Sequence, residues 1–206
     1  MKSTRSPGHR HIQLFENRFF EVFTVFPLVA FLLLWPLLIA LVASVGAFTA
    51  PLGWAILLVV PGWLAWTATE YALHRYVFHY KPRSKLMREV IFVIHGNHHA
   101  DPNDLLRNLM PPIVSIPVGG LIWAMCVGIF GAAGTWFFLG FIGGYVIYDL
   151  VHYCCHQFPM KGRIARMLKA HHMHHHFHAN EGNYAITGMI WDRVLSTRIT
   201  AKKIEA

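Results

Sequence analysis

Four apolar runs, arranged in two pairs, limit what this chain can fold into. They cover roughly residues 23–47, 53–69, 113–130 and 135–148, and none contains a charged residue. A helix rises about 1.5 Å per residue, so the longer runs can cross about 30 Å of hydrocarbon. The connection within each pair is short and uncharged. We therefore predict four transmembrane helices in two antiparallel hairpins, with bends at Pro27, Pro36 and Pro61 in the first hairpin.

The basic residues predict the orientation of these helices. All 18 Lys and Arg residues lie in segments 1–18, 75–107 and 161–203, and neither hairpin turn carries one. Four spans place those three segments on one face, which the positive-inside rule makes cytoplasmic. The net charge of +8 is thereby assigned to membrane orientation, and nucleic acid is not expected as a partner.

Composition is consistent with one membrane domain. The chain has 206 residues, of which 55% are hydrophobic and only 14% charged. We expect an all-α membrane protein, with solvated His9 and His11 near the N-terminus. The expected order is an N-terminal arm (1–18), the first hairpin (19–74), a first cytosolic segment (75–110), the second hairpin (111–151) and a second cytosolic segment (152–206).

Ten of the 15 histidines form four clusters on the predicted cytoplasmic face. Residues 95–99 read HGNHH and residues 172–176 read HMHHH. On a helix, the H-x-x-H-H spacing puts three imidazoles on one face. The last triplet has two registers, because His171, His174 and His175 fit the same spacing. The other clusters are the pairs His74/His79 and His152/His156, each near the end of an apolar run.

This number of histidines favours two metal ions. Imidazole binds zinc, copper, iron and nickel, and a closed zinc site needs only four ligands. Ten ligands shared between two octahedral ions leave one open position on each. Two iron ions with facing open positions could activate O2 and hydroxylate an unactivated C–H bond, using two external electrons. Zinc could replace iron in isolated protein.

A ligating imidazole needs a hydrogen-bond acceptor for its second ring nitrogen. Glu70 lies four residues before His74, and Asp149 lies three before His152. We expect these carboxylates to accept from the ligating rings; the alternative is that each only adds charge at the membrane surface. Asn97, inside the first triplet, could help to position a ligand.

At these residues the sequence resembles the fatty acid 2-hydroxylase branch of the fatty acid hydroxylase superfamily. That superfamily also contains sterol oxidases and desaturases and carotenoid hydroxylases. The agreement includes residues beside the histidines, notably an MPP motif and a WD motif. The matching segments are 70–79 (EYALHRYVFH), 95–112 (HGNHHADPNDLLRNLMPP), 144–156 (GYVIYDLVHYCCH) and 168–196 (LKAHHMHHHFHANEGNYAITGMIWDRVLS).

The resemblance implies four transmembrane helices beneath a cytosolic cap that holds a dimetal centre. An aromatic residue follows the last triplet of the family, and it corresponds to Phe177. This favours the register that begins at His172 and leaves His171 out. The implied ligands are His74, His79, His95, His98, His99, His152, His156, His172, His175 and His176.

The resemblance also bears on the electron donor. Several eukaryotic members carry a fused cytochrome b5 domain, for which the first 18 residues are too short. We therefore expect a separate donor, of ferredoxin or cytochrome b5 type. A bacterial inner membrane is the expected location, with the endoplasmic reticulum as the alternative.

Together these features predict a dimetal monooxygenase that hydroxylates carbon 2 of a fatty acyl chain, free or within a sphingolipid-like lipid. Carbon 2 lies near the head group, which fits a site at the cytosolic ends of the spans, although a channel could deliver other carbons to the same metals. One alternative is the same centre acting on a sterol or carotenoid, or desaturating an acyl chain. Another is a non-catalytic metal- or haem-binding membrane protein. The absence of histidine from the four apolar runs argues against metal transport, and haem would use two or four of the histidines.

Overall fold

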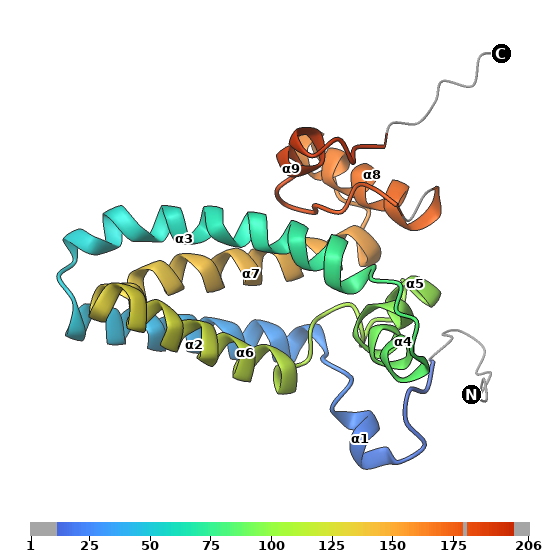
Figure 1. The fold of residues 1–206 in the computed structure, drawn as a ribbon, viewed down its shortest axis with the longest axis horizontal. Helices are drawn as coiled ribbons and strands as arrows, with labels where there is room; N and C mark the ends of the chain where they lie inside the picture. Colours follow the sequence, from blue (N-terminus) through green and yellow to red (C-terminus); the bar gives the residue numbers. More distant parts are fainter. Residues whose placement is uncertain (1–11, 179–180, 200–206) are drawn as a thin grey trace.

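Four long helices form the body of the protein. The computed structural model describes residues 12–178 and 181–199, and within these residues all regular secondary structure is helical. The arm residues His9 and His11 lie outside the described residues. Helices α2 (Leu28–Thr49), α3 (Gly53–Ala72), α6 (Pro112–Phe130) and α7 (Gly134–Gln157) run side by side (Figure 1). The expected all-α fold class is confirmed for the described residues.

Within the described part of the chain, three helical stretches are long and apolar enough to cross a membrane. They are Leu28–Thr49, Gly53–Phe78 and Pro112–Gln157. The second joins α3 to a π-helix, η1 (Leu73–Phe78). The third contains both α6 and α7, which the short 3-10 helix η3 (Gly131–Ala133) connects.

The first apolar run does not begin its helix at residue 23. Arg18–Val22 forms a separate helix, α1, and α2 begins only after Pro27, whose backbone is extended. A proline pushes the preceding residue out of the helical region, so a helix continuing from residue 23 is interrupted there. Pro36 and Pro61, by contrast, lie inside α2 and α3 without ending them.

Helix α7 is the centre of the bundle, because α2, α3 and α6 all pack against it. Two glycines allow α3 and α7 to approach closely: a Cβ atom at Gly62 would lie 2.0 Å from the carbonyl oxygen of Phe137. One at Gly140 would lie 1.9 Å from that of Val59. Small residues permit such close helix packing in membranes.

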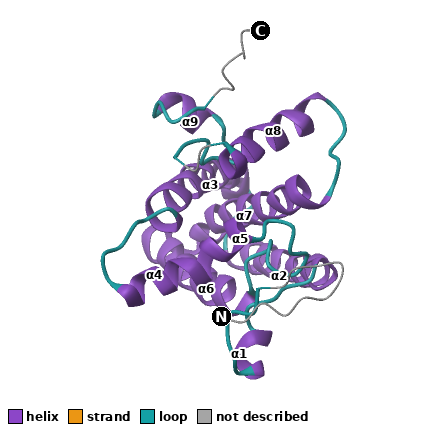
Figure 2. Cartoon of the chain, turned by 90° about the vertical axis from the view of Figure 1, so that its right-hand side faces the viewer, coloured by secondary structure: helices purple, strands orange, loops and turns teal. Residues whose placement is uncertain are grey.

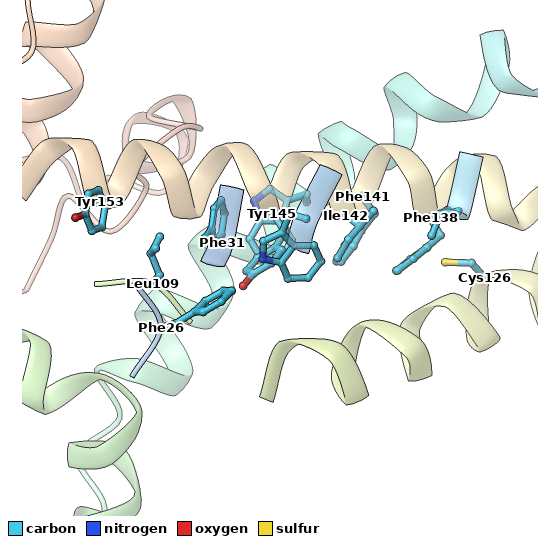
Figure 3. Packing of buried hydrophobic residues seen from close by; sticks show 12 residues of the cluster. Phe26, Phe31, Leu109, Cys126, Phe138, Phe141, Ile142, Tyr145 and Tyr153 are labelled. Carbon is cyan, nitrogen blue, oxygen red and sulfur yellow. The ribbon is translucent and has the colours of Figure 1, made fainter. Parts of the chain in front are cut away.

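The buried core lies along the same helix. Tyr145 of α7 occupies its middle, with Phe31 and Phe141 among its neighbours in the core (Figure 3). Its ring is edge-on to Trp35 of α2 at 5.1 Å and to Trp66 of α3 at 5.2 Å between centroids. Aromatic pairs prefer this arrangement, so one residue of α7 ties two helices together.

The shorter helices gather at one end of the bundle, on the right in Figure 1 and toward the viewer in Figure 2. They carry both histidine triplets, and together they cover the ends of α3 and α7. They are α4 (Lys85–Ile91), the π-helix η2 (Phe92–Gly96), α5 (Asn97–Ala100), α8 (Arg163–Phe177) and α9 (Ile190–Val194).

Candidate metal centre

The ten clustered histidines meet at this end of the bundle and form two groups of five. Within each group, one ring nitrogen from every histidine lies within 4.8 Å of the others, so each group could hold a metal ion. The first histidine group contains His74, His79, His95, His99 and His175. The second histidine group contains His98, His152, His156, His172 and His176.

The triplets are shared between the groups in a reciprocal way. In the first triplet, the outer residues His95 and His99 belong to the first group, and the inner residue His98 belongs to the second. In the last triplet, the outer residues, His172 and His176, belong to the second group, and the inner residue, His175, belongs to the first. Each group is completed by one of the two pairs. His171 and His174 belong to neither group.

A π-helix explains the five-residue spacing of one pair. In an α-helix, residues five apart point about 140° away from each other. In η1 the amide of His79 donates to the carbonyl of His74 at 3.1 Å, the i→i+5 bond of a π-turn. The wider turn brings both rings to the same side, and their Nε2 atoms are 3.2 Å apart.

A second π-helix precedes the first triplet, and Asn97 stabilises it. The side-chain amide of Asn97 donates to the carbonyls of Phe92 and Val93 at 3.0 and 2.7 Å. Asn97 is buried, and it satisfies carbonyl groups in the turn that carries His95. Its effect on the histidines is therefore exerted through the backbone.

In the second group, hydrogen bonds fix two rings so that their lone pairs face each other. Nδ1 of His98 lies 3.2 Å from Oδ1 of Asn108, and Nδ1 of His152 lies 3.0 Å from the Asn108 carbonyl. Both acceptors are oxygen atoms, because the Asn108 amide nitrogen donates to Pro102 instead. Each Nδ1 therefore carries the hydrogen, and each Nε2 keeps its lone pair. These two Nε2 atoms are 2.9 Å apart.

The first group shows the same arrangement. Nδ1 of His74 donates to the carbonyl of Tyr184 at 2.5 Å, and Nδ1 of His175 donates to that of Gly182 at 2.7 Å. Nε2 of His74 and of His175 both face Nε2 of His79, at 3.2 and 3.0 Å. Lone pairs in such positions repel each other unless a cation lies among them.

The distances fit a shared ion. Two nitrogens that bind one metal at 2.0–2.1 Å and at right angles are about 3 Å apart. Burial and neighbouring imidazoles also lower the pKa of His79 to about 4 and that of His99 to about 3. Burial lowers the pKa of His98 well below its ordinary value. These rings are therefore neutral near pH 7, as a metal ligand must be.

Glu70 does not accept the hydrogen bond of His74, contrary to our expectation. Its carboxylate accepts from the amides of Ile186 and Thr187, at 2.5 and 2.9 Å, and from the Thr187 hydroxyl. The carbonyl of Tyr184 takes the acceptor role at His74 instead. Glu70 thus binds the backbone at residues 186–187, close to Tyr184, whose carbonyl accepts from His74. It supports His74 indirectly, by fixing this segment.

Asp149 does not accept the hydrogen bond of His152 either. It accepts from the Met110 amide at 3.0 Å and from the Tyr145 hydroxyl at 3.1 Å. His152 donates to the carbonyl of Asn108, two residues before Met110. Both carboxylates therefore act indirectly: each binds the backbone segment whose carbonyl group accepts from the ligating ring, and neither accepts from the ring itself.

Asp192, in the WD motif, is a functional candidate that we did not single out from the sequence. Its fully buried carboxylate accepts from His171, Thr197 and the amides of Tyr184 and Ala185, at 2.7 to 3.0 Å. Burial opposes its ionisation, but these hydrogen bonds outweigh burial and lower its pKa. It anchors the segment whose carbonyls accept from His74 and His175.

An apolar cavity of about 560 Å³ leads to the histidines. It is lined by α1, α3, α6 and α7 and by the segments around η2 and Asn108. About half of its lining residues are Leu, Ile, Val or Phe, and three histidines also line it: His95 of the first group and His98 and His152 of the second. An aliphatic ligand in this cavity would therefore meet both groups.

A separate, open cleft of about 1010 Å³ also borders the two histidine groups, at residues that the apolar cavity does not touch. It is lined by His79 of the first group and His176 of the second, and by the basic residues Arg75 and Lys81. Lys81 is paired there with Glu181. The histidines of this cleft and those of the apolar cavity do not overlap, so the centre is approached from two directions.

Comparison with known proteins identifies the family. The fatty acid hydroxylase family model matches residues 59–197. The chain is 33% identical to dihydroceramide fatty acyl 2-hydroxylase FAH2 of Arabidopsis thaliana, covering 90% of this chain and 79% of that protein. It is 37% identical to fatty acid 2-hydroxylase of Homo sapiens, covering 66% of this chain and 38% of that protein.

A solved structure agrees. The structure of full-length scs7p, in which only the hydroxylase domain is visible, matches with a TM-score of 0.81 and 27% identity. The match covers 89% of this chain and 70% of that chain. The resemblance seen in the histidine segments is confirmed, and with it the prediction of an enzyme. The chain belongs to the fatty acid hydroxylase family, whose curated members similar to it are oxidoreductases.

Proposed function

We propose that this protein is a membrane dimetal monooxygenase that hydroxylates carbon 2 of a fatty acyl chain, free or within a sphingolipid-like lipid. The observation that carries the proposal is the apolar cavity, which ends at imidazoles of both histidine groups. The printed names of the relatives, a dihydroceramide fatty acyl 2-hydroxylase and a fatty acid 2-hydroxylase, support the substrate class.

The ten histidines would be the ligands of two metal ions, five for each ion. Iron is the expected metal, although imidazoles also accept zinc. Bound iron would supply the chemistry in which O2, two electrons and two protons convert a C–H bond to C–OH and release one water. The residues of this chain hold the ions, exclude water from the acyl chain and place the carbon beside His95, His98 and His152.

The shape of the cavity supports attack at carbon 2. Along α7, the cavity extends from His152 to Phe141, which is about 16 Å of helix. Its far end is apolar, and the polar side chains Asn97 and Asn108 lie at the histidine end. An acyl tail in the apolar part leaves the carbonyl end beside the histidines, and carbon 2 is the first carbon after the carbonyl.

The same proposal includes four spans in one domain, with the cap in the cytoplasm of a bacterial inner membrane. Its support is the apolar surface of the long helices. Phe48 and Ile56 are 91% and 80% exposed near the hairpin turn, where lipid would cover them. Basic residues occupy segments 75–110 and 152–206, as the positive-inside rule requires of a cytoplasmic face.

A separate ferredoxin or cytochrome b5 type protein would supply the electrons at the open cleft. The cleft admits a protein surface, and His79 and His176 offer one ring of each group at its wall. Lys81 is already paired with Glu181, so the positive charge that favours an acidic partner beside these histidines is that of Arg75. The acyl chain would meanwhile occupy the other approach, so substrate and donor would not compete.

The test is mass spectrometry of total lipids from cells that co-express a donor system and are grown with isotopically labelled O2. Wild type should produce labelled 2-hydroxy acyl chains. His98→Ala should produce none, and His174→Ala, which changes a histidine of the same cap outside both groups, should match wild type. A labelled hydroxyl at another carbon, a labelled sterol or carotenoid, or a new double bond would contradict the proposal.

A further inference from the structure

We propose that the end of the apolar cavity beside Gly119 sets the longest acyl chain that the enzyme accepts. This inference rests on the proposed function, because it assumes that an acyl chain fills the cavity. It goes further by assigning chain-length selection to one short stretch of α6, where a glycine leaves room that any other side chain would occupy.

The cavity lies between two helices that pack on α7. Helices α3 and α6 both contact α7, and the cavity is lined by residues of all three. Beyond Tyr145, the lining includes Val118, Gly119 and Ile122 from α6, Phe141 and Ile142 from α7, and Trp66 from α3. All of these except Gly119 carry bulky apolar side chains, so they form the wall that the end of an acyl tail would reach.

Gly119 differs from the other residues of this wall, because the space beside it is not filled. It is buried, and a Cβ atom built there would have only Ile142 Cδ1 at 3.7 Å and Phe138 Cζ at 3.9 Å within 4 Å. These are ordinary van der Waals distances, so a methyl group fits without moving its neighbours. A longer side chain would have to extend into the cavity that Gly119 lines.

The next residue provides a matched control. Gly120 lies on the same helix, but it is exposed, and a Cβ atom there has nothing within 4 Å. Substitution at Gly120 therefore changes helix propensity and hydrophobicity as much as substitution at Gly119 does. It does not change the cavity, so the difference between the two variants isolates the effect of cavity length.

Size changes at this wall should act in both directions. Gly119→Leu shortens the cavity and should shift the accepted chains to shorter lengths, with Gly119→Ala giving a smaller shift in the same sense. Ile122→Ala removes a side chain from the same wall and should admit longer chains. Burial of one methylene changes binding roughly fourfold, so two displaced methylenes correspond to roughly a fifteenfold change in preference.

The experiment offers cells an equimolar series of saturated fatty acids of graded length and measures the chain lengths of the 2-hydroxy products. The ratio of the longest to the shortest product should fall roughly fifteenfold in Gly119→Leu. It should rise in Ile122→Ala and stay at the wild-type value in Gly120→Leu. Equal profiles for Gly119→Leu and Gly120→Leu would overturn the inference.

A second measurement separates this inference from the proposed function. The fatty acyl chains that co-purify with each variant report binding without turnover, and they should show the same order of chain lengths. If wild type forms no 2-hydroxy product, the proposed function fails while the bound chains still test the cavity. If Gly119→Leu does not fold, Gly119→Ala and Ile122→Ala must still shift in opposite directions; no shift in either would overturn the inference.

Discussion

The two histidine groups contain the same kinds of residue but are supported differently. Each consists of one pair, the outer residues of one triplet and the inner residue of the other. In the first group, the ring N–H groups of His74 and His175 donate to backbone carbonyls of the segment around residues 182–184. In the second, those of His98 and His152 donate to one residue, Asn108. One group thus depends on a loop, and the other depends on a single side chain and its carbonyl.

The two groups also differ in how many of their ring nitrogens have a hydrogen-bond partner and in how firmly those partners are held. The loop that supports the first group is held by two buried carboxylates, Glu70 and Asp192. In the second group, Nδ1 of His172 and Nδ1 of His176 are buried without a protein hydrogen-bond partner among the described residues. Ring orientation and basicity are set by such partners. We therefore expect the second group to bind its metal more weakly than the first.

The largest effect should follow removal of the inner histidine of a triplet. His175→Ala should cost the first group its metal, and His98→Ala should cost the second group its metal. Each variant should retain about one ion per chain, measured by elemental analysis after purification. Hydroxylation should fall by more than the roughly 10- to 100-fold that loss of an outer hydrogen-bond partner costs. His174→Ala is the control; loss of metal in that variant would contradict the assignment of the groups.

The next effect should come from Asp192→Ala, which acts through the loop. It leaves two backbone amides, a hydroxyl and a histidine without their buried acceptor, and hydrogen bonds to a charged group are worth about 1.5–3 kcal/mol each. We expect the free energy of unfolding to fall by more than about 3 kcal/mol. Thermal and denaturant melts measure this loss of stability.

Background variants show which group Asp192 supports. In a His98→Ala background, where only the first group holds metal, adding Asp192→Ala should release the remaining ion. In a His175→Ala background, where only the second group does, the metal content should not change. Equal metal loss in both backgrounds would show that the loop supports both histidine groups. The proposed difference, in which the loop supports only the first group, would then be wrong.

The apolar runs predicted the helical fold, spacing located the four histidine clusters, and the family resemblance selected the register of the last triplet, but none of these predicted the division into two groups. The H-x-x-H-H pattern puts three rings on one helix face, and only the position of the facing helices decides which ring binds where. The spacing of His74 and His79 did not reveal the π-turn, which, unlike an α-helix, aligns residues five apart. Glu70 was assigned to His74 from helical spacing, but a loop more than a hundred residues later competes for its carboxylate.

A third, smaller effect is expected from Asn108→Ala. It removes the acceptor of His98, while the backbone carbonyl that accepts from His152 stays. Metal affinity of the second group should fall by about 10- to 100-fold, and that of the first group should not change. Competition with a chelator, followed by elemental analysis, measures both. Asn103→Ala, at an exposed residue of the same segment, should match wild type.

The smallest effect should come from Asp149→Asn, and it tests whether Asp149 acts by position or by charge. One oxygen of Asp149 accepts from both the Met110 amide and the Tyr145 hydroxyl, and an amide oxygen can accept the same two bonds. If Asp149 only fixes the segment that leads to Asn108, Asp149→Asn should lose at most about 1 kcal/mol of stability and keep its metal. Asp149→Leu should then weaken the second group, though less than Asn108→Ala does. Equal metal loss in the Asn and Leu variants would mean that the negative charge stabilises the ion directly, and that the second group, like the first, depends on a carboxylate.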